Sequence, residues 1–120
     1  MVRVDIEEGG LSPMHTHPDA TKLGLVVQGE IRVLTPTSFY SKVLQPGDVF
    51  VVPKGMLHFA INSGKGKAIG FVSFSSENPT IHTLDFLLFA NKFPSDLVAK
   101  TTLLDLDQVK KLKAHFGGSG

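Results

Sequence analysis

Short apolar segments, separated by turn residues, follow one another along the first two thirds of the chain. Residues 2–7 alternate apolar and polar side chains, which is the period of a strand buried on one face. Similar segments recur about every ten residues with Gly or Pro between them, as in antiparallel sandwiches and small barrels. They lie at residues 23–28, 31–34, 39–44, 49–52, 57–61 and 68–74. The pattern predicts an all-β fold, with a hairpin that turns at Gly29.

Helical patterns begin only in the last third of the chain. Residues 83–90 are apolar enough for a short packed helix, although their period also allows a strand. A second short helix is predicted over residues 95–100. The strongest pattern comes last, where Asp105 as N-cap and Gln108 three residues later form a capping box. One face of this helix carries the apolar residues Leu106, Val109, Leu112 and Phe116, and such a face needs a surface to cover it.

The length and composition allow one modest core. The chain has 120 residues, of which 42% are apolar. We expect a β-barrel over residues 1–82, a C-terminal helical arm over residues 83–116 and a flexible tail over residues 117–120. The helical arm and the uncovered strand edges both favour association into a homo-oligomer.

Charge and cysteine content exclude several classes of function. The 12 basic and 11 acidic residues give a formal charge of +1, so we expect no nucleic-acid partner. Without cysteine the chain has no disulfide scaffold and no thiol nucleophile. The residues after Met1 do not resemble a signal peptide or a membrane span, so we expect no membrane partner and a chain that is either cytosolic or trimmed.

Histidines supply the candidate chemistry. Side chains alternate between the faces of a strand, so His15 and His17 point the same way and can offer two imidazoles to one site. His58, in a second cluster of turn residues, provides a third imidazole if the two segments fold side by side. Three imidazoles form a plausible cup for a divalent transition metal. His82 and His115 stand alone and are interpreted as surface or packing residues.

Two spaced motifs carry a family resemblance that runs from about Val2 to Phe116. The first is Gly9-x5-His15-x-His17-x4-Lys22-x6-Gly29, and the second is Gly47-x5-Pro53-x-Gly55-x2-His58-x3-Asn62. In order and separation they resemble the two boxes of the germin and germin-like proteins, within the cupin superfamily.

The resemblance implies a cupin jelly-roll β-barrel with a manganese ion inside it. In that family three histidines and one glutamate hold the ion, and these map onto His15, His17, His58 and the position of Lys22. Family activities include oxalate oxidase and superoxide dismutase. Members are typically extracellular proteins of the plant apoplast, often assembled as dimers or trimers of dimers through C-terminal helices.

Three features depart from the family pattern. A lysine ammonium cannot replace the glutamate, because at about 4 Å and an effective dielectric constant near 20 its repulsion of Mn²⁺ costs on the order of 8 kcal/mol before relaxation. Ser12 and Met14 stand where oxidase-type germins typically carry asparagine and proline, which disfavours an oxalate oxidase. The chain also begins just before the first motif, so we expect either a naturally shortened member or a chain trimmed at its N-terminus.

Three interpretations of function follow. In the first, the chain is a small-molecule enzyme without the usual manganese and glutamate, in which Lys22 and His58 are catalytic and a desolvated Lys22 amine serves as base or nucleophile. In the second, three histidines retain Mn²⁺ for an oxidoreductase. In the third, the chain is a non-catalytic binding, storage or assembly protein, and the long Lys22 stem carries its amine to solvent. Candidate pocket-lining residues are Met14, Phe50, Met56, Phe59 and Phe74.

Overall fold

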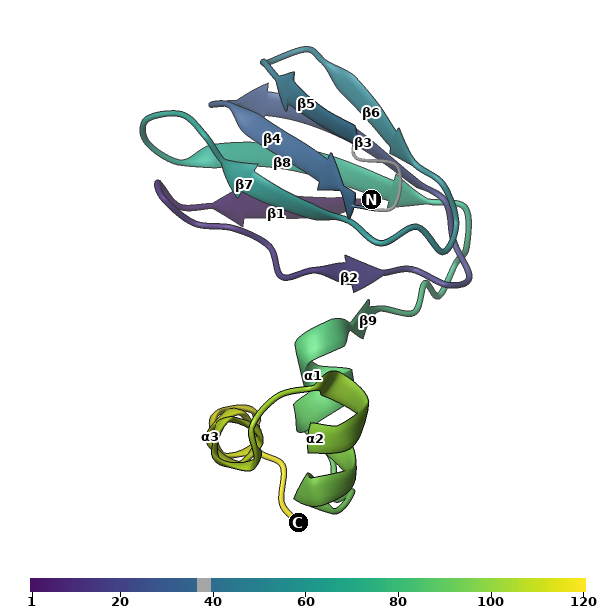
Figure 1. Cartoon of the computed structure of the whole chain (residues 1–120). Helices are drawn as coiled ribbons and strands as arrows, with labels where there is room; N and C mark the ends of the chain where they lie inside the picture. Colours follow the sequence, from purple (N-terminus) through teal and green to yellow (C-terminus); the bar gives the residue numbers. More distant parts are fainter. Residues whose placement is uncertain (37–39) are drawn as a thin grey trace. The chain divides into compact units, whose positions relative to one another are not determined.

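Two units make up the chain, Met1–His82 and Thr83–Gly120. The structure is a computed structural model, and it describes residues 1–36 and 40–120 (Figure 1). The strands are β1 (Val2–Ile6), β2 (His15–Thr16), β3 (Lys22–Gln28), β4 (Ile31–Thr35), β5 (Tyr40–Leu44), β6 (Val49–Val52), β7 (Phe59–Asn62), β8 (Ala68–Phe74) and β9 (His82–Thr83). The division between the two units falls inside β9.

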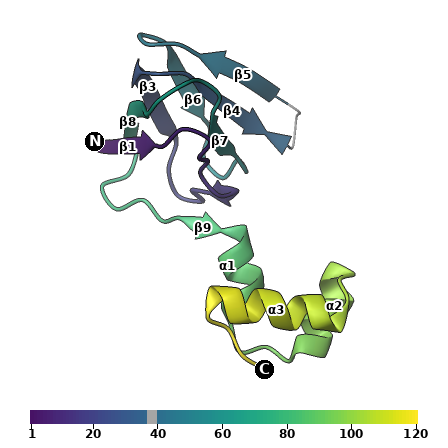
Figure 2. The same ribbon diagram turned by 90° about the vertical axis from the view of Figure 1, so that its left-hand side faces the viewer.

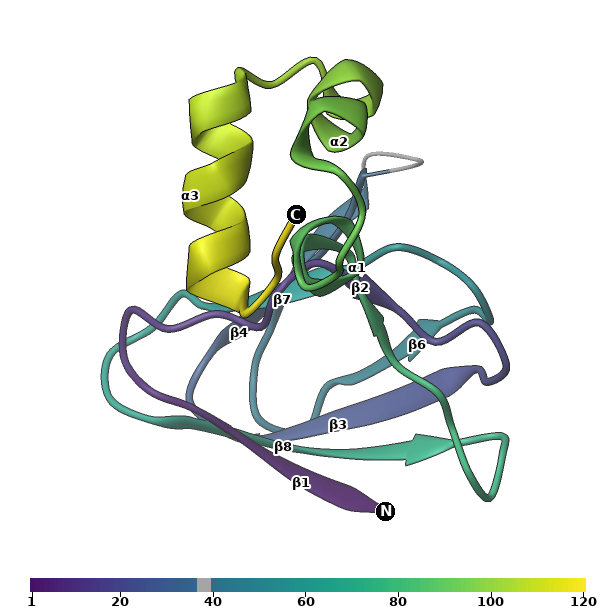
Figure 3. The same ribbon diagram turned by 90° about the horizontal axis from the view of Figure 1, so that it is seen from below.

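The strands of the first unit form two main antiparallel sheets. One sheet has the order β1-β8-β3-β6 and the other has the order β5-β4-β7. Strands β1, β8 and β3 run side by side in Figure 3. The antiparallel all-β fold predicted from the sequence is confirmed, and its arrangement fits a jelly roll. Phe39, which the predicted strand 39–44 included, lies outside the described residues.

The turn at Gly29 connects the two sheets. Its φ of 76° is in the left-handed region, and a Cβ there would lie 2.9 Å from the Cα of Ala68, so only glycine fits. The predicted hairpin at this turn is wrong. β3 pairs with β6 and β8, whereas β4 pairs with β5 and β7, so the chain passes from one sheet to the other.

The core of the first unit lies between the sheets and takes residues from both. Val26 on β3 and Leu44 on β5 are fully buried. They pack with Ile31, Val33 and Ala68, and Phe50 and Ala60 cover the cluster in part. Because apolar side chains from both sheets are buried there, the face-to-face packing of the two sheets is stabilised.

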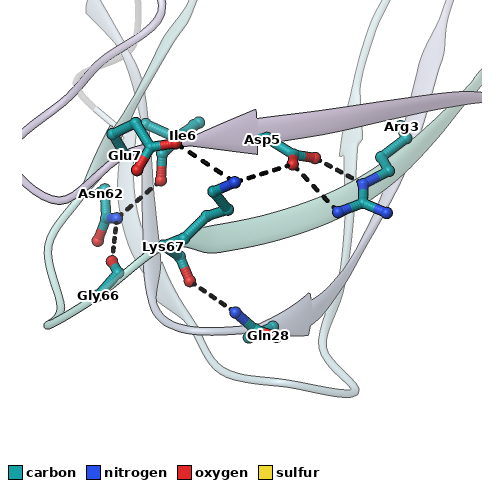
Figure 4. Close-up of polar contacts among 8 residues, drawn as sticks. All are labelled: Arg3, Asp5, Ile6, Glu7, Gln28, Asn62, Gly66 and Lys67. Atoms are coloured by element: carbon teal, nitrogen blue, oxygen red, sulfur yellow. Dashed lines mark hydrogen bonds and ion pairs between the residues drawn. The ribbon is translucent and has the colours of Figure 1, made fainter.

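Asn62, the last residue of the second motif, has a structural role. Its Nδ2 donates to the carbonyl of Ile6 at 3.0 Å and to that of Gly66 at 2.8 Å, which ties the end of β7 to β1 (Figure 4). Beside it, Lys67 Nζ lies 3.6 Å from Asp5 and 3.4 Å from Glu7. This residue of the second motif therefore links the edge strands of the two main sheets instead of taking part in the histidine cluster.

The second unit consists of three helices, α1 (Leu84–Phe89), α2 (Ser95–Thr102) and α3 (Leu106–Phe116) (Figure 2). The prediction of α3 and its capping box is confirmed, since Gln108 Oε1 accepts from the Asp105 N–H at 3.2 Å. Residues 83–90 contain a helix rather than a long strand. The core of this unit is built from Phe89, Val98 and Val109, with Ala99, Leu104, Leu112 and Phe116 packed against it.

The last residues contact the helices. Lys113 is buried, and its Nζ donates to the carbonyl of Ser119 at 2.7 Å and to that of Phe93. The Ser95 N–H donates to the Gly120 carbonyl at 3.1 Å. Among the described helices, none combines the length and apolar character that crossing a membrane requires.

Truncation of Leu44 tests the packing between the sheets. Leu44→Ala removes a fully buried side chain and should lower the free energy of unfolding by about 2–5 kcal/mol. Its neighbour Val43 is 47% exposed, so Val43→Ala should cost less than about 1 kcal/mol. Urea unfolding followed by circular dichroism measures both values. Equal losses from the two variants would contradict the assignment of this core.

Candidate metal centre

An isolated antiparallel bridge brings the two sequence motifs together. The His15 N–H donates to the His58 carbonyl at 3.0 Å, and the His58 N–H donates to the His15 carbonyl at 3.0 Å. The two imidazoles lie with their centroids 4.2 Å apart. The His17 ring lies 5.0 Å from His15 and 5.5 Å from His58. The structure therefore brings together the three histidines that the sequence singled out, and all three are buried.

Backbone carbonyls fix the tautomer of every ring. The Nδ1 atoms of His15, His17 and His58 lie 2.7, 2.9 and 2.9 Å from the carbonyls of Pro13, Thr80 and Met56, respectively. A carbonyl oxygen can only accept, so each Nδ1 carries the proton and each Nε2 carries a lone pair, which at His58 faces the Lys22 amine at 3.5 Å. One ring nitrogen from each histidine can be chosen so that all three lie within 4.8 Å of one another.

The Nε2 atom of His17 is buried and has no hydrogen-bond partner. A buried polar atom without a partner costs free energy, which a bound ion or ligand would recover. The ring packs against Phe74 with centroids 4.8 Å apart, so one predicted lining residue does lie at the site. The unpaired lone pair of His17 Nε2 is therefore available to a ligand.

Lys22 begins β3 and lies beside the histidines. Its register partners are Val52 on β6 and Phe74 on β8, and its Nζ lies 3.5 Å from His58 Nε2. Desolvation lowers the pKa of Lys22 to about 8. The expectation that the Lys22 stem carries its amine to solvent is therefore wrong, because the amine stays next to an imidazole, and the non-catalytic interpretation stays a prediction without that expectation.

Burial keeps the imidazoles neutral. Desolvation lowers the pKa of His58 to about 4, and the positive charge of Lys22 acts in the same direction. The pKa values of His15 and His17 are also lowered, again mainly by burial. In each case the backbone hydrogen bond opposes the shift without reversing it. Neutral imidazoles are the form that binds metal ions.

A small cavity extends from Lys22 between the two sheets. Its volume is about 50 Å³, and Phe50 and Ala60 are among its lining residues. Phe50 thus lines a cavity that reaches Lys22 but that none of the three histidines lines, whereas Met56 contributes its carbonyl and Met14 is 38% exposed. Phe59 does not line this cavity.

The site does not fit the manganese centre that the family resemblance implies. Mn²⁺ favours carboxylate, carbonyl and water oxygens. Within the described ranges, the cluster that could hold an ion contains histidines alone. Asp19 is near in sequence, but its carboxylate accepts from the Thr80 N–H at 2.9 Å and from the Thr80 hydroxyl at 2.7 Å. Three neutral imidazoles and an amine bring no negative charge to the ion.

Sequence reasoning missed the residues that orient the rings. Pro13, Met56 and Thr80 act through their backbone carbonyls, which every residue type carries, so side-chain patterns could not reveal them. Asp19 holds Thr80 and thereby the partner of His17. Its position two residues after His17 was the only available signal, and it does not by itself show where the carboxylate lies.

Comparison with known proteins agrees with this geometry. The Cupin family model matches residues 1–110. Auxin-binding protein ABP19a of Prunus persica is 47% identical over 122 residues, which cover 99% of this chain and 58% of that protein. Germin-like protein subfamily 3 member 1 of Arabidopsis thaliana is 47% identical over 121 residues, covering 98% of this chain and 58% of that protein.

A solved structure of oxalate oxidase in complex with the substrate analogue glycolate superimposes with a TM-score of 0.88. It is 37% identical, over 95% of this chain and 61% of that chain. The chain therefore belongs to the cupin family. Within that family it is a germin-like cupin, similar to plant proteins, and it spans 58% of the length of the two curated relatives described above.

Acid should destabilise the metal-free protein through His58. The unfolded state binds a proton near pH 6.5 and the folded state only near pH 4, so the free energy of unfolding should fall as the pH drops through that window. His58→Gln should make the fall shallower, and His82→Gln, at an exposed histidine, should leave it unchanged. Urea unfolding at several pH values measures the slope. A slope that His58→Gln does not alter would contradict this assignment.

Proposed function

We propose that the chain binds a divalent metal ion through His15, His17 and His58 and acts on a small organic molecule held between that ion and Lys22. The observation that supports the proposal is the shared tautomer of the three rings. Each Nδ1 donates to a carbonyl, so each Nε2 is the nitrogen that can ligate an ion, and at His58 that ion would take the place of the Lys22 contact.

The number of protein ligands supports an enzyme. Structural zinc sites are closed by four protein ligands, whereas catalytic sites use three and leave a position for substrate or water. Here the described cluster provides three imidazoles. A bound ion would polarise a carbonyl or carboxylate group placed in the open position.

Lys22 supplies the second half of the proposed site. Its Nζ is 3.5 Å from His58 Nε2, so a molecule that reaches the ion also reaches the amine. The cavity of about 50 Å³ that Lys22 lines would admit only a small substrate. Glycolate, the analogue bound in the similar oxalate oxidase, is such a molecule. We therefore propose a small carboxylate or carbonyl compound as the substrate class.

Metal binding by the histidines can be measured directly. After removal of metal and reloading, the protein should bind about one divalent ion per chain, and His17→Ala should weaken binding by at least about 100-fold, because loss of even a partner of a ligand costs about 10–100-fold. His82→Ala is the control, since this histidine is exposed. Calorimetry and elemental analysis measure affinity and content. Binding that does not depend on His17 would refute the proposal.

A second candidate function uses Lys22 without a metal. Its specific support is the burial of the amine, which lowers the pKa to about 8 and raises the fraction of nucleophilic free amine at neutral pH. The amine would attack a substrate carbonyl, and loss of water would give an iminium ion. Borohydride would then deliver hydride to this C=N bond and leave a stable secondary amine on Lys22.

Borohydride trapping tests this candidate. Metal-free protein incubated with glyoxylate and borohydride should be modified at Lys22 before other lysines, because its amine is the more nucleophilic at pH 7. Lys22→Met should abolish the fast labelling, whereas Lys54→Met, at an exposed lysine, should not. Mass spectrometry of peptides locates the label. Equal labelling of Lys22 and exposed lysines would count against iminium chemistry.

A further inference from the structure

We infer that this site selects nitrogen-preferring divalent ions of the Zn²⁺ class and discriminates against Mn²⁺ more strongly than a site with a carboxylate at position 22 would. The inference rests on the proposed function, namely that His15, His17 and His58 bind a metal ion. It concerns which ion they bind, and hence which class of reaction the site supports.

The first argument concerns the donor atoms of the site. Imidazole suits Zn²⁺, Cu²⁺, Fe²⁺ and Ni²⁺, whereas Mn²⁺ depends on carboxylate, carbonyl and water oxygens. All three rings present Nε2 lone pairs because their Nδ1 protons are donated to carbonyls. Lys22 contributes no negative charge in either protonation state. The described site therefore offers nitrogen donors alone, and its net charge is zero or positive, depending on whether Lys22 is protonated.

No nearby carboxylate compensates for Lys22. Among the described residues, the cluster able to hold an ion consists of the three histidines. The acidic residue next in sequence, Asp19, accepts two hydrogen bonds from Thr80. Around Lys22 the register partners are Val52 and Phe74, both apolar. An ion at this site must therefore be held by the neutral imidazoles of the three histidines, with no described carboxylate to balance its charge.

Coordination geometry favours the same class of ion. Zn²⁺ is satisfied by four ligands in a tetrahedron, so three imidazoles and one further group complete its shell. A six-coordinate ion with oxygen ligands needs three more positions on the side opposite the rings. Lys22 Nζ lies 3.5 Å from His58 Nε2 and takes up space beside the imidazole donors. The lysine thus removes an anionic ligand and also narrows the room for additional oxygen ligands.

The choice of ion changes the chemistry that the site supports. Zn²⁺ has no redox change under biological conditions and acts by polarising a bound carbonyl or water. A site loaded with this ion would promote hydrolysis, hydration or proton transfer on a small carbonyl or carboxylate compound. It would not promote the electron transfer that an oxidase or a dismutase needs.

The test compares two ions in three forms of the full chain. Zn²⁺ binds more tightly than Mn²⁺ to most sites, so the informative quantity is how the ratio of the two dissociation constants changes. Lys22→Glu should strengthen Mn²⁺ binding at least about tenfold more than Zn²⁺ binding, because it adds an oxygen ligand. Lys22→Met is the matched control. It removes positive charge without adding a ligand and should improve both affinities by similar factors.

Three results separate the inference from the proposed function. If Lys22→Glu changes both affinities by the same factor, or if the native chain binds Mn²⁺ within about tenfold of Zn²⁺, the inference is overturned while metal binding stands. If the native chain binds neither ion, the proposed function fails and the inference fails with it.

A measurement on the native chain covers the case in which a variant does not fold. Co²⁺ loaded in place of Zn²⁺ should give the intense visible absorption of a four-coordinate centre. A weak six-coordinate spectrum would overturn the inference, because it would show that Lys22 leaves room for a full oxygen shell.

Discussion

The pair of backbone hydrogen bonds between His15 and His58 is the constraint on which the site depends. Each residue donates its N–H to the carbonyl of the other, and this bridge joins the first motif to the second. Without this bridge, His15 and His17 of the first motif would not lie beside His58 of the second motif. The two main sheets pack around Val26 and Leu44, and the segments that carry His15 and His58 connect their strands.

Backbone carbonyls around the three rings are the second constraint, because they fix the rotation and the tautomer of each imidazole. Three imidazoles could rotate or change tautomer, and either change would turn an N–H toward the common space. Hydrogen bonds from Nδ1 to Pro13, Met56 and Thr80 prevent this. The cost of this arrangement is the unpaired Nε2 of His17. Buried polar atoms without partners are uncommon, and a ligand site is one physical reason for them to persist.

Sequence patterns predicted the fold class and the histidine cluster because both follow from alternation along a strand. The same-face placement of His15 and His17 is a local property. The strand partners are not local, and the predicted hairpin at Gly29 failed because the turn could equally lead the chain into another sheet. Spacing grouped Asn62 with the histidines, although its side chain bonds to Ile6 and Gly66 instead.

The position of the Lys22 amine shows the limit of such patterns most clearly. A lysine at the start of a strand can extend to solvent or turn inward, and sequence alone left both possibilities open. The choice depends on the neighbours across the sheet, Val52 and Phe74, and on the space beside His58. These neighbours are determined only in the folded structure. The sequence therefore did not decide between a buried amine with a lowered pKa and an exposed one, although it did predict the cluster of three histidines.

The scaffold and the chemistry of the site are separable. The hydrogen bonds that hold each Nδ1 and the bridge between His15 and His58 involve no atom of Lys22, whose amine contacts the Nε2 of His58 instead. A change at position 22 therefore alters the charge and the donor set while the imidazole geometry stays in place. Under the proposed function, this separation would let one germin-like framework keep its three histidines while residue 22 changes the donor set.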